Sequence, residues 1–183
     1  MGRKEGHSAA EMTAIAAVDR HWGIGRNGGL LLSLPPDLRR FRALTLGHTV
    51  VMGRRTFQSL PGGHGLPGRR NLVLTRTPDR PLPGAEAVSL SALLALRAPE
   101  GGEIFVIGGQ SVYELLLPYC RAAHITRIEA DLGPADVFFP ELDSAPDWRL
   151  VSRTETERCE GTVFFYAYYE RIAHSLEDSP EAL

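Results

Sequence analysis

Short runs of apolar residues alternate with stretches of helical periodicity along most of the chain. The apolar runs lie at about 13–18, 49–52, 71–75, 104–107 and 122–128, and the helical stretches at about 36–46, 55–60, 90–97 and 110–117. This alternation is typical of parallel strands joined by crossover helices. Segments 148–157 and 162–170, with Gly161 between them, show strand-like alternation. The pattern predicts an α/β fold: a central, mixed, mostly parallel sheet flanked by helices, with a C-terminal antiparallel hairpin at one edge.

Length and composition agree with one domain. The chain has 183 residues, is 43% hydrophobic and carries a formal charge of −2, which is enough apolar material for a single sizeable core. We expect a domain over 12–171, between a flexible N-terminal extension (1–11) and a flexible C-terminal tail (172–183), because both ends are polar. The basic residues are scattered, so we expect neither nucleic acid nor a membrane surface as a partner. The run 12–18 is too short to span a bilayer.

Cysteine and histidine spacing gives no sign of a metal site. Cys120 and Cys159 are far apart in sequence and lie in apolar surroundings, so we expect free, buried thiols in a reducing cytoplasm. The six histidines form no ligand spacing that is typical of zinc. We therefore assign no metal to the protein.

One carboxylate stands out against an apolar surrounding. Pro35 and Pro36 favour a helix start, which places Asp37 in the first turn, with Phe41 four residues later on the same face. Arg39, Arg40 and Arg42 are expected to point toward solvent on the other side. A partly desolvated carboxylate of this kind has a raised pKa and suits proton handling. The alternative is structural, because aspartate is common in first turns of helices.

Two segments have the pattern strand, glycine, helix. Residues 49–57 lead through Gly53 into a helix start with Arg54, Arg55 and Thr56, and residues 103–113 lead through Gly108 and Gly109 into a second helix. Helix N-terminal amides, a hydroxyl and a guanidinium are suited to phosphate. Two such units favour a ligand with more than one phosphate, although glycine at a strand end often marks only a tight turn.

Taken together, the motifs resemble dihydrofolate reductase of the bacterial type, over about residues 12–170. In chain order they are Ala-Ile-Ala-Ala-Val-Asp from Ala14, Gly-Ile-Gly from Gly23, Leu-Pro-Pro-Asp ending at Asp37, Val-Met-Gly-Arg-Arg-Thr from Val51, Leu-Pro-Gly-Arg ending at Arg69, Phe-Val-Ile-Gly-Gly from Phe105, and Asp-Val-Phe-Phe-Pro from Asp136. Several independent motifs in the right order are far more specific than any one of them.

The resemblance implies a substrate site around Asp37, which would bind the pterin ring and assist its protonation, with Thr126 as hydroxyl partner. Arg69 resembles the arginine that holds the substrate's glutamate carboxylate, a task for which a planar guanidinium is suited. The further substrate-binding residues that the resemblance implies are Ile15, Ala17, Leu38, Phe41, Leu60, Leu66, Ile107 and Tyr113.

The resemblance also implies NADPH as cofactor. Ala17 and Ile24 would offer backbone groups to the nicotinamide, and Arg76 beside Arg54 would take the 2′-phosphate, which favours NADPH over NADH. Gly108-Gly109 resembles the family's non-proline cis peptide. The other cofactor-binding residues implied are Gly53, Arg55, Thr56, Thr75, Gln110, Ser111 and Val112.

The resemblance therefore implies NADPH-dependent reduction of 7,8-dihydrofolate to tetrahydrofolate, in a cytoplasmic monomer that also binds antifolate inhibitors. Leu31 and Leu32 depart from the family, where many members have proline and tryptophan, so the active-site loop is expected to pack differently. Two alternatives stay open. One is a reductase of riboflavin synthesis with the same fold and cofactor, and the other is a module that binds ligand without turnover.

Overall fold

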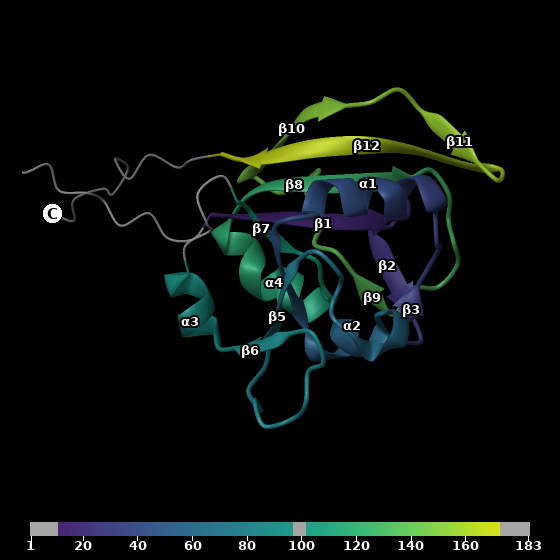
Figure 1. Cartoon of the computed structure of the whole chain (residues 1–183). Helices are drawn as coiled ribbons and strands as arrows, with labels where there is room; N and C mark the ends of the chain where they lie inside the picture. Colours follow the sequence, from purple (N-terminus) through teal and green to yellow (C-terminus); the bar gives the residue numbers. More distant parts are fainter. Residues whose placement is uncertain (1–10, 97–101, 173–183) are drawn as a thin grey trace, which may run out of the picture.

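The main sheet has the strand order β10-β12-β8-β1-β7-β4-β5-β6, and β11 pairs with β12 outside this path (Figure 1). The computed structural model describes residues 11–96 and 102–172. The strands of this sheet are β1 (Met12–Val18), β4 (Thr49–Gly53), β5 (Arg70–Leu74), β6 (Glu86–Val88), β7 (Ile104–Val106), β8 (Cys120–Ile128), β10 (Trp148–Arg153), β11 (Glu157–Cys159) and β12 (Thr162–Arg171).

Pairing directions confirm the predicted mixed sheet. Strands β1, β4, β5, β6, β7 and β8 run parallel to their neighbours among themselves, whereas β12 is antiparallel to β8 and to β10 and β11. A small second sheet has the order β3-β2-β9, formed by β3 (Gly29–Leu30), β2 (Gly23–Arg26) and β9 (Val137–Phe138). The sequence pattern did not predict this second sheet or β6, because strands of two to four residues are too short to show a period.

The four predicted helices are present, with boundaries close to those expected. They are α1 (Pro35–Thr45), α2 (Arg54–Ser59), α3 (Leu90–Ala95) and α4 (Gln110–Leu116), and two 3₁₀ turns follow helices, η1 (Pro61–Gly63) and η2 (Leu117–Tyr119). The predicted end of the third helix, at 97, lies outside the described residues, as do most of the predicted extensions 1–11 and 172–183. Within the described part of the chain, no helix is both long and apolar enough to cross a membrane.

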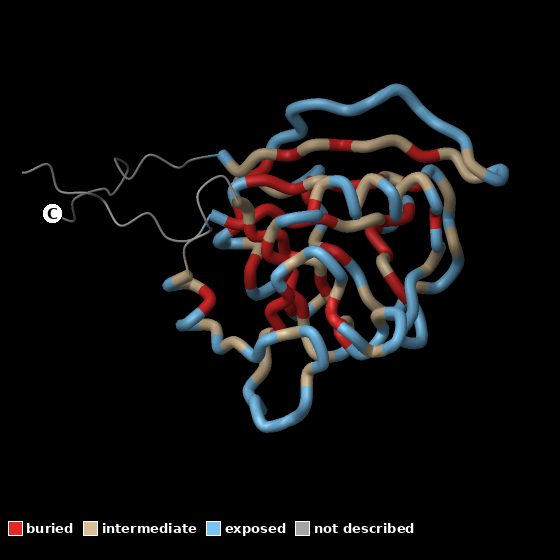
Figure 2. The backbone as a smooth tube through the Cα atoms, viewed as in Figure 1, coloured by how far each residue is buried: buried red, intermediate tan, exposed pale blue. Residues whose placement is uncertain are grey.

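Alternating side chains divide the core between the two faces of the sheet, and the buried segments run through its centre (Figure 2). On one face, Ile15, Met52 and Phe105 pack with residues of α1 and α2. On the other face, Ala14, Val51 and their neighbours pack against α3 and α4. The α1 face is the one that carries Asp37 and its surroundings.

The predicted strand 148–157 is interrupted, which corrects the simple hairpin. The register of β10 against β12 shifts between Leu150 and Ser152, and β11 begins only at Glu157. At the break, the Thr154 N–H donates to the Tyr166 carbonyl (2.9 Å), and the Tyr166 N–H donates to the Thr154 hydroxyl (3.0 Å). A side-chain hydroxyl thus takes the place of a backbone carbonyl as acceptor, which ends the regular ladder.

Helix α3 begins with a side-chain cap that offers a stability test. The hydroxyl of Ser89 accepts a hydrogen bond from the Ala92 N–H (3.2 Å). We expect Ser89→Ala to lower the free energy of unfolding by about 1 kcal/mol, because it leaves a first-turn amide without its partner. Urea denaturation measures the change. Ser144→Ala, a change at an exposed serine outside the helix, is the control and should cost less than about 0.5 kcal/mol; equal midpoints for the two variants would contradict the cap's contribution.

Candidate active site

Strand β1 extends beyond its neighbour β7 at the carboxyl end of the sheet. It pairs with β8 along its whole length, but with β7 only from Met12 to Ala14. The hydroxyl of Tyr113, on α4, donates to the Ile15 carbonyl (2.7 Å) on the side where β7 has ended. Because backbone groups two residues apart point the same way, the N–H and C=O of Ala17 face the same open side. This is the switch point of the sheet, where ligands of open α/β folds bind.

Asp37 lies in the first turn of α1, as predicted, after prolines at the first two helical positions. Its Oδ1 accepts a hydrogen bond from the hydroxyl of Thr126, which lies on β8. Burial raises the pKa of the Asp37 carboxyl above its ordinary value, against smaller opposing effects from the Thr126 hydrogen bond and the Arg40 charge. Among the described residues, the Thr126 hydroxyl to Oδ1 is the hydrogen bond that Asp37 accepts through its side chain, and Oδ2 has no hydrogen-bond partner there.

The predicted apolar walls lie mostly together. Five of the predicted residues belong to the cluster on the α1 face, namely Ile15, Phe41, Leu60, Leu66 and Ile107. Leu38 differs, because 45% of its surface is exposed. Tyr113 packs in the cluster on the opposite face and reaches the site only through its hydroxyl.

Arg69 is held beside α1 by a defined set of contacts. Its Nη1 donates to the Thr45 hydroxyl (3.2 Å), which itself donates to the Phe41 carbonyl (2.8 Å). Its Nε donates to the Pro67 carbonyl (3.0 Å), and its guanidinium carbon lies 6.0 Å from the centre of the Phe41 ring. The guanidinium is therefore positioned over the end of the apolar cluster rather than free in solvent.

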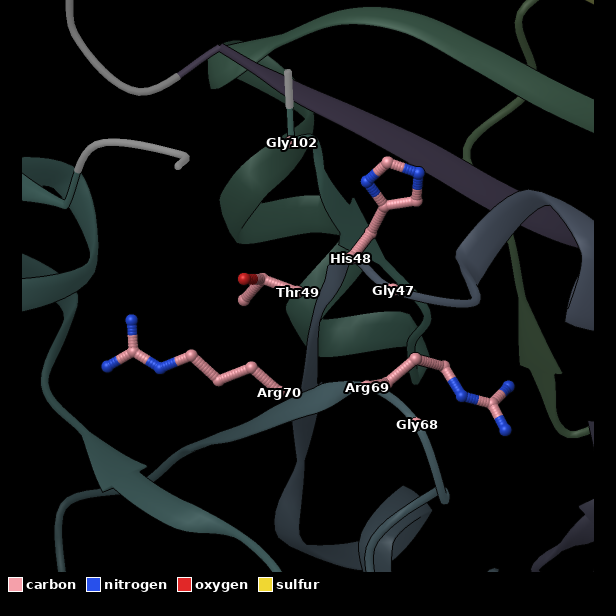
Figure 3. Close-up of a pocket in the computed structure, with 7 residues that line it drawn as sticks. All are labelled: Gly47, His48, Thr49, Gly68, Arg69, Arg70 and Gly102. Carbon is pink, nitrogen blue, oxygen red and sulfur yellow. The ribbon is translucent and has the colours of Figure 1, made fainter. Parts of the chain in front are cut away.

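A pocket of about 470 Å³ lies at the amino ends of β4, β5 and β7. Arg69 and Arg70 lie in its wall (Figure 3). The two arginine side chains point in opposite directions (Figure 3). Arg70 pairs with both carboxylate oxygens of Glu86, at 3.0 Å each. Of these two arginines, only Arg69 thus turns toward α1. The glycine-bearing segments before α2 and α4 lie at the opposite, carboxyl end of these strands.

The glycine-bearing segments meet at the carboxyl ends of β4, β5 and β7. The Gly53 N–H donates to the Gly108 carbonyl (2.8 Å), which joins the segment before α2 to the segment before α4. A Cβ on Gly109 would come within 3.4 Å of the Thr56 hydroxyl, so backbone and hydroxyl are close. Neither helix has a side-chain cap, because Gly53 and Gly109 are their N-cap residues.

The residues predicted to contact phosphate lie on the segments that follow these strands, and they differ in exposure and in partners. Arg54 donates to the Thr75 hydroxyl (3.2 Å) and to the Thr77 carbonyl (2.6 Å), and Arg76 lies exposed between these two residues. Arg55 and Ser111 are exposed as well, whereas Val112 is buried. Gln110 is partly engaged elsewhere, because its amide contacts the Phe138 N–H (2.8 Å) and Glu114 (2.7 Å).

This arrangement matches a known family. The family model described as dihydrofolate reductase matches residues 11–171. The chain belongs to the dihydrofolate reductase family. Curated dihydrofolate reductases are similar to it over most of their length: that of Bacillus subtilis is 38% identical over 161 residues, covering 86% of this chain and 92% of the relative, and that of Mycobacterium leprae is 41% identical over 152 residues, covering 81% and 90%.

A solved dihydrofolate reductase has the same fold. The enzyme from Enterococcus faecalis, complexed with NADP(H) and RAB-propyl, superimposes with a TM-score of 0.76 at 31% identity, covering 89% of this chain and 98% of that one. The non-proline cis peptide implied by the dihydrofolate reductase resemblance is present between Gly108 and Gly109.

The loop after β1 is held by a side-chain carboxylate, a backbone hydrogen bond and apolar packing. Oδ1 of Asp19 accepts hydrogen bonds from the His21 N–H (2.9 Å) and the Gly23 N–H (2.8 Å), which fixes the entry to β2. The Ile24 carbonyl accepts from the Leu31 N–H (3.3 Å). Leu32 packs against Leu34, Ile128 and Phe164, so apolar contacts hold this end of the loop.

Two expectations need correction. Arg40 does not point into solvent, because it is half-buried and its guanidinium carbon lies 4.3 Å from the centre of the Tyr166 ring. Arg39 and Arg42 are exposed, as predicted. Both cysteines are free, but only Cys120 is buried; Cys159 is half-buried at the end of β11.

Proposed function

We propose that this protein reduces 7,8-dihydrofolate to 5,6,7,8-tetrahydrofolate with NADPH, and that Asp37 assists protonation of the substrate. Membership of the dihydrofolate reductase family makes it an NADPH-dependent oxidoreductase. The observation that supports the role of Asp37 best is its environment: a carboxyl with a raised pKa, held by Thr126 at the edge of an apolar cluster. Oδ1 is fixed by the protein and Oδ2 is available to a ligand.

The residues of this site would orient the substrate ring and favour its protonation through their charges. A carboxylate that pairs with two N–H groups on one edge of a flat ring fixes the ring in one orientation. The apolar residues Ile15, Phe41 and Ile107 exclude water from its faces. The negative charge on Asp37 raises the basicity of a nearby ring nitrogen, which favours its protonation. Arg69 would hold a carboxylate at the far end of the substrate.

The residues at the carboxyl ends of β4, β5 and β7 fit NADPH in their chemistry. Arg54, Arg76 and the Thr56 hydroxyl supply donors for phosphates, and the Ala17 backbone faces the open side of β1, where a carboxamide has both a donor and an acceptor to meet. When bound, NADPH supplies the hydride. The chain supplies its position beside the substrate.

A spectrophotometric assay with a coenzyme control tests this proposal. We expect NADPH absorbance to fall rapidly when dihydrofolate is added to the purified protein, and to fall much more slowly with NADH, because Arg76 and Arg54 favour the extra phosphate. Unchanged absorbance with NADPH bound would contradict the proposal. It would direct attention to a substrate of riboflavin synthesis or to a module that only binds.

The remaining parts of the proposal concern partners and location. We propose that antifolates occupy the substrate site through Asp37, that the chain acts as a monomer and that it resides in the cytoplasm, where its two thiols stay reduced. Light scattering of the purified protein measures the oligomeric state, and a mass twice that of the chain would contradict the monomer.

A further inference from the structure

Arg40 occupies an unusual place for a helix arginine. It lies one turn after Asp37 on α1 and is half-buried, whereas Arg39 and Arg42 on the same helix are exposed. Its guanidinium lies over the ring of Tyr166, on β12, with 4.3 Å between the guanidinium carbon and the ring centre. Burial raises the pKa of the Tyr166 phenol, so this residue stays neutral and the contact is of the cation–π type.

The backbone of Tyr166 is itself held in place from two sides. Tyr166 is paired with Thr126 of β8 in the sheet, and the donor and acceptor of its backbone both bond to Thr154 (3.0 and 2.9 Å). Thr126 in turn donates its hydroxyl to Asp37. Asp37, Thr126, Tyr166 and Arg40 therefore form one connected group that spans α1, β8 and β12.

Titratable side chains from several elements surround Arg40 and Asp37. Burial lowers the pKa of Arg40, while Tyr166, Asp37 and Glu157 of β11 act in the opposite direction, and an arginine remains charged at any physiological pH. His124 of β8 also faces Arg40, but burial lowers its pKa to about 4, so it is neutral near pH 7. Tyr113 of α4 faces Asp37 and is fully buried and neutral. In the described part of the chain, Arg40 is the cation that acts on Asp37.

We propose that Arg40 is an electrostatic positioning residue for Asp37, and that its charge, fixed on the Tyr166 ring, sets the pH range in which the protein reduces its substrate. The inference rests on the proposed function, since it concerns the same carboxyl. The guanidinium makes no hydrogen bond to Asp37 and acts through space. A positive charge held nearby favours the ionised carboxylate, and so counteracts part of the effect of burial.

The direction of the effect follows from this sign. The reduction slows as the pH rises, because the proton shared by the substrate and Asp37 is lost. Without the charge of Arg40, the carboxyl and its bound substrate keep that proton to a higher pH. We expect Arg40→Gln to move the alkaline midpoint of the rate profile upward by about 0.5–1 pH unit, a value reduced by the partial exposure of the site. Arg40→Lys, which keeps the charge, should stay close to wild type.

The experiment compares turnover with NADPH and dihydrofolate from about pH 5 to 9 in wild type, Arg40→Gln, Arg40→Lys and Arg39→Gln. The last variant is the matched control, because it removes one positive charge from an exposed neighbour on the same helix. A second readout needs no turnover: titration of the Asp37 carboxyl by carbon-13 NMR in the cofactor-free protein, with the signal assigned from Asp37→Asn. If wild type shows no turnover, the proposed function fails while the titration still tests Arg40.

An upward shift in Arg40→Gln that is absent from Arg39→Gln supports the proposal. A folded Arg40→Gln protein with both midpoints unchanged overturns it, and so does an equal shift in Arg39→Gln. If Arg40→Gln does not fold, Glu157→Gln decides, because this exposed carboxylate is a neighbour of Arg40 and its loss leaves the guanidinium less compensated. The alkaline midpoint of the rate profile should be lower in Glu157→Gln than in wild type, and an unmoved midpoint overturns the proposal.

Discussion

Replacing Asp37 with asparagine is expected to lower turnover with dihydrofolate by about 10²–10⁴ while NADPH binding stays intact, which is the range for a lost acid–base group. Asparagine keeps the shape of the side chain and can still accept the Thr126 hydroxyl. It cannot carry the negative charge that favours protonation of the substrate. Steady-state kinetics measure the loss of turnover, and quenching of protein fluorescence on titration with NADPH measures binding.

Asp131→Asn is the matched control for this variant, because Asp131 is exposed and lies outside the site; it should turn over at the wild-type rate. Turnover of Asp37→Asn within about threefold of wild type would contradict the role of Asp37, since that loss is far below the range for general acid–base catalysis.

The same variant is expected to be at least as stable as wild type near pH 7. In the folded protein the pKa of Asp37 is raised above its ordinary value of 3.8, so ionising this carboxyl opposes folding. The penalty is absent below the ordinary value, where the carboxyl is protonated in both states, and it develops as the pH rises to the folded-state pKa. Thermal unfolding at neutral and acid pH separates a catalytic defect from a folding defect.

Replacing Arg69 with leucine is expected to raise the KM for dihydrofolate about 10- to 100-fold with little change in kcat, because a charged hydrogen-bonded contact is lost in substrate and transition state alike. The structure holds the guanidinium between Thr45 and Pro67, so little side-chain freedom is left to lose on binding. Leucine keeps an apolar side chain beside Phe41 but lacks the guanidinium that lies 6.0 Å from its ring centre.

Two comparisons make this second prediction specific. Arg70→Leu changes the adjacent arginine, which points away and pairs with Glu86 (Figure 3), and should leave the KM within about twofold, as expected for an exposed pair. A pterin substrate without the glutamate tail should be reduced equally well by wild type and Arg69→Leu. An equal loss with the tailless substrate would show that Arg69 does not bind the tail.

The sequence predicted the parts of the fold that show either a continuous apolar run or a helical hydrophobic period. Parallel strands that are buried on both faces form apolar runs, so β1, β4, β5, β7 and β8 were predictable, with their crossover helices. Strands β2, β3 and β9 were not, because they have only two to four residues. The pairing of β2 with β9 also joins positions more than a hundred residues apart, such as Gly23 with Phe138. The break between β10 and β11 depends on a side-chain bond from Thr154, which leaves no trace in hydropathy.

Motifs supplied the candidate site residues, and the raised pKa of Asp37 followed from the apolar pattern around it. The position of Arg40 beside them was not predicted. The resemblance supplied Asp37, Thr126 and Arg69, and the structure places each of them around the α1 face. Helical periodicity assigned Arg40 to the solvent side because it considers α1 alone. The position of Arg40 depends on Tyr166, which is far away in sequence and reaches α1 only because β12 pairs with β8.

The most direct measurement of the central claim is isotope transfer from the coenzyme. The protein is incubated with dihydrofolate and NADPH that carries deuterium at the transferable position of the nicotinamide, and the folate product is examined by mass spectrometry. We expect tetrahydrofolate with one deuterium per molecule, formed by wild type and in much smaller amount by Asp37→Asn. Absence of tetrahydrofolate, or tetrahydrofolate without the label, would contradict hydride transfer from NADPH as the activity of this protein.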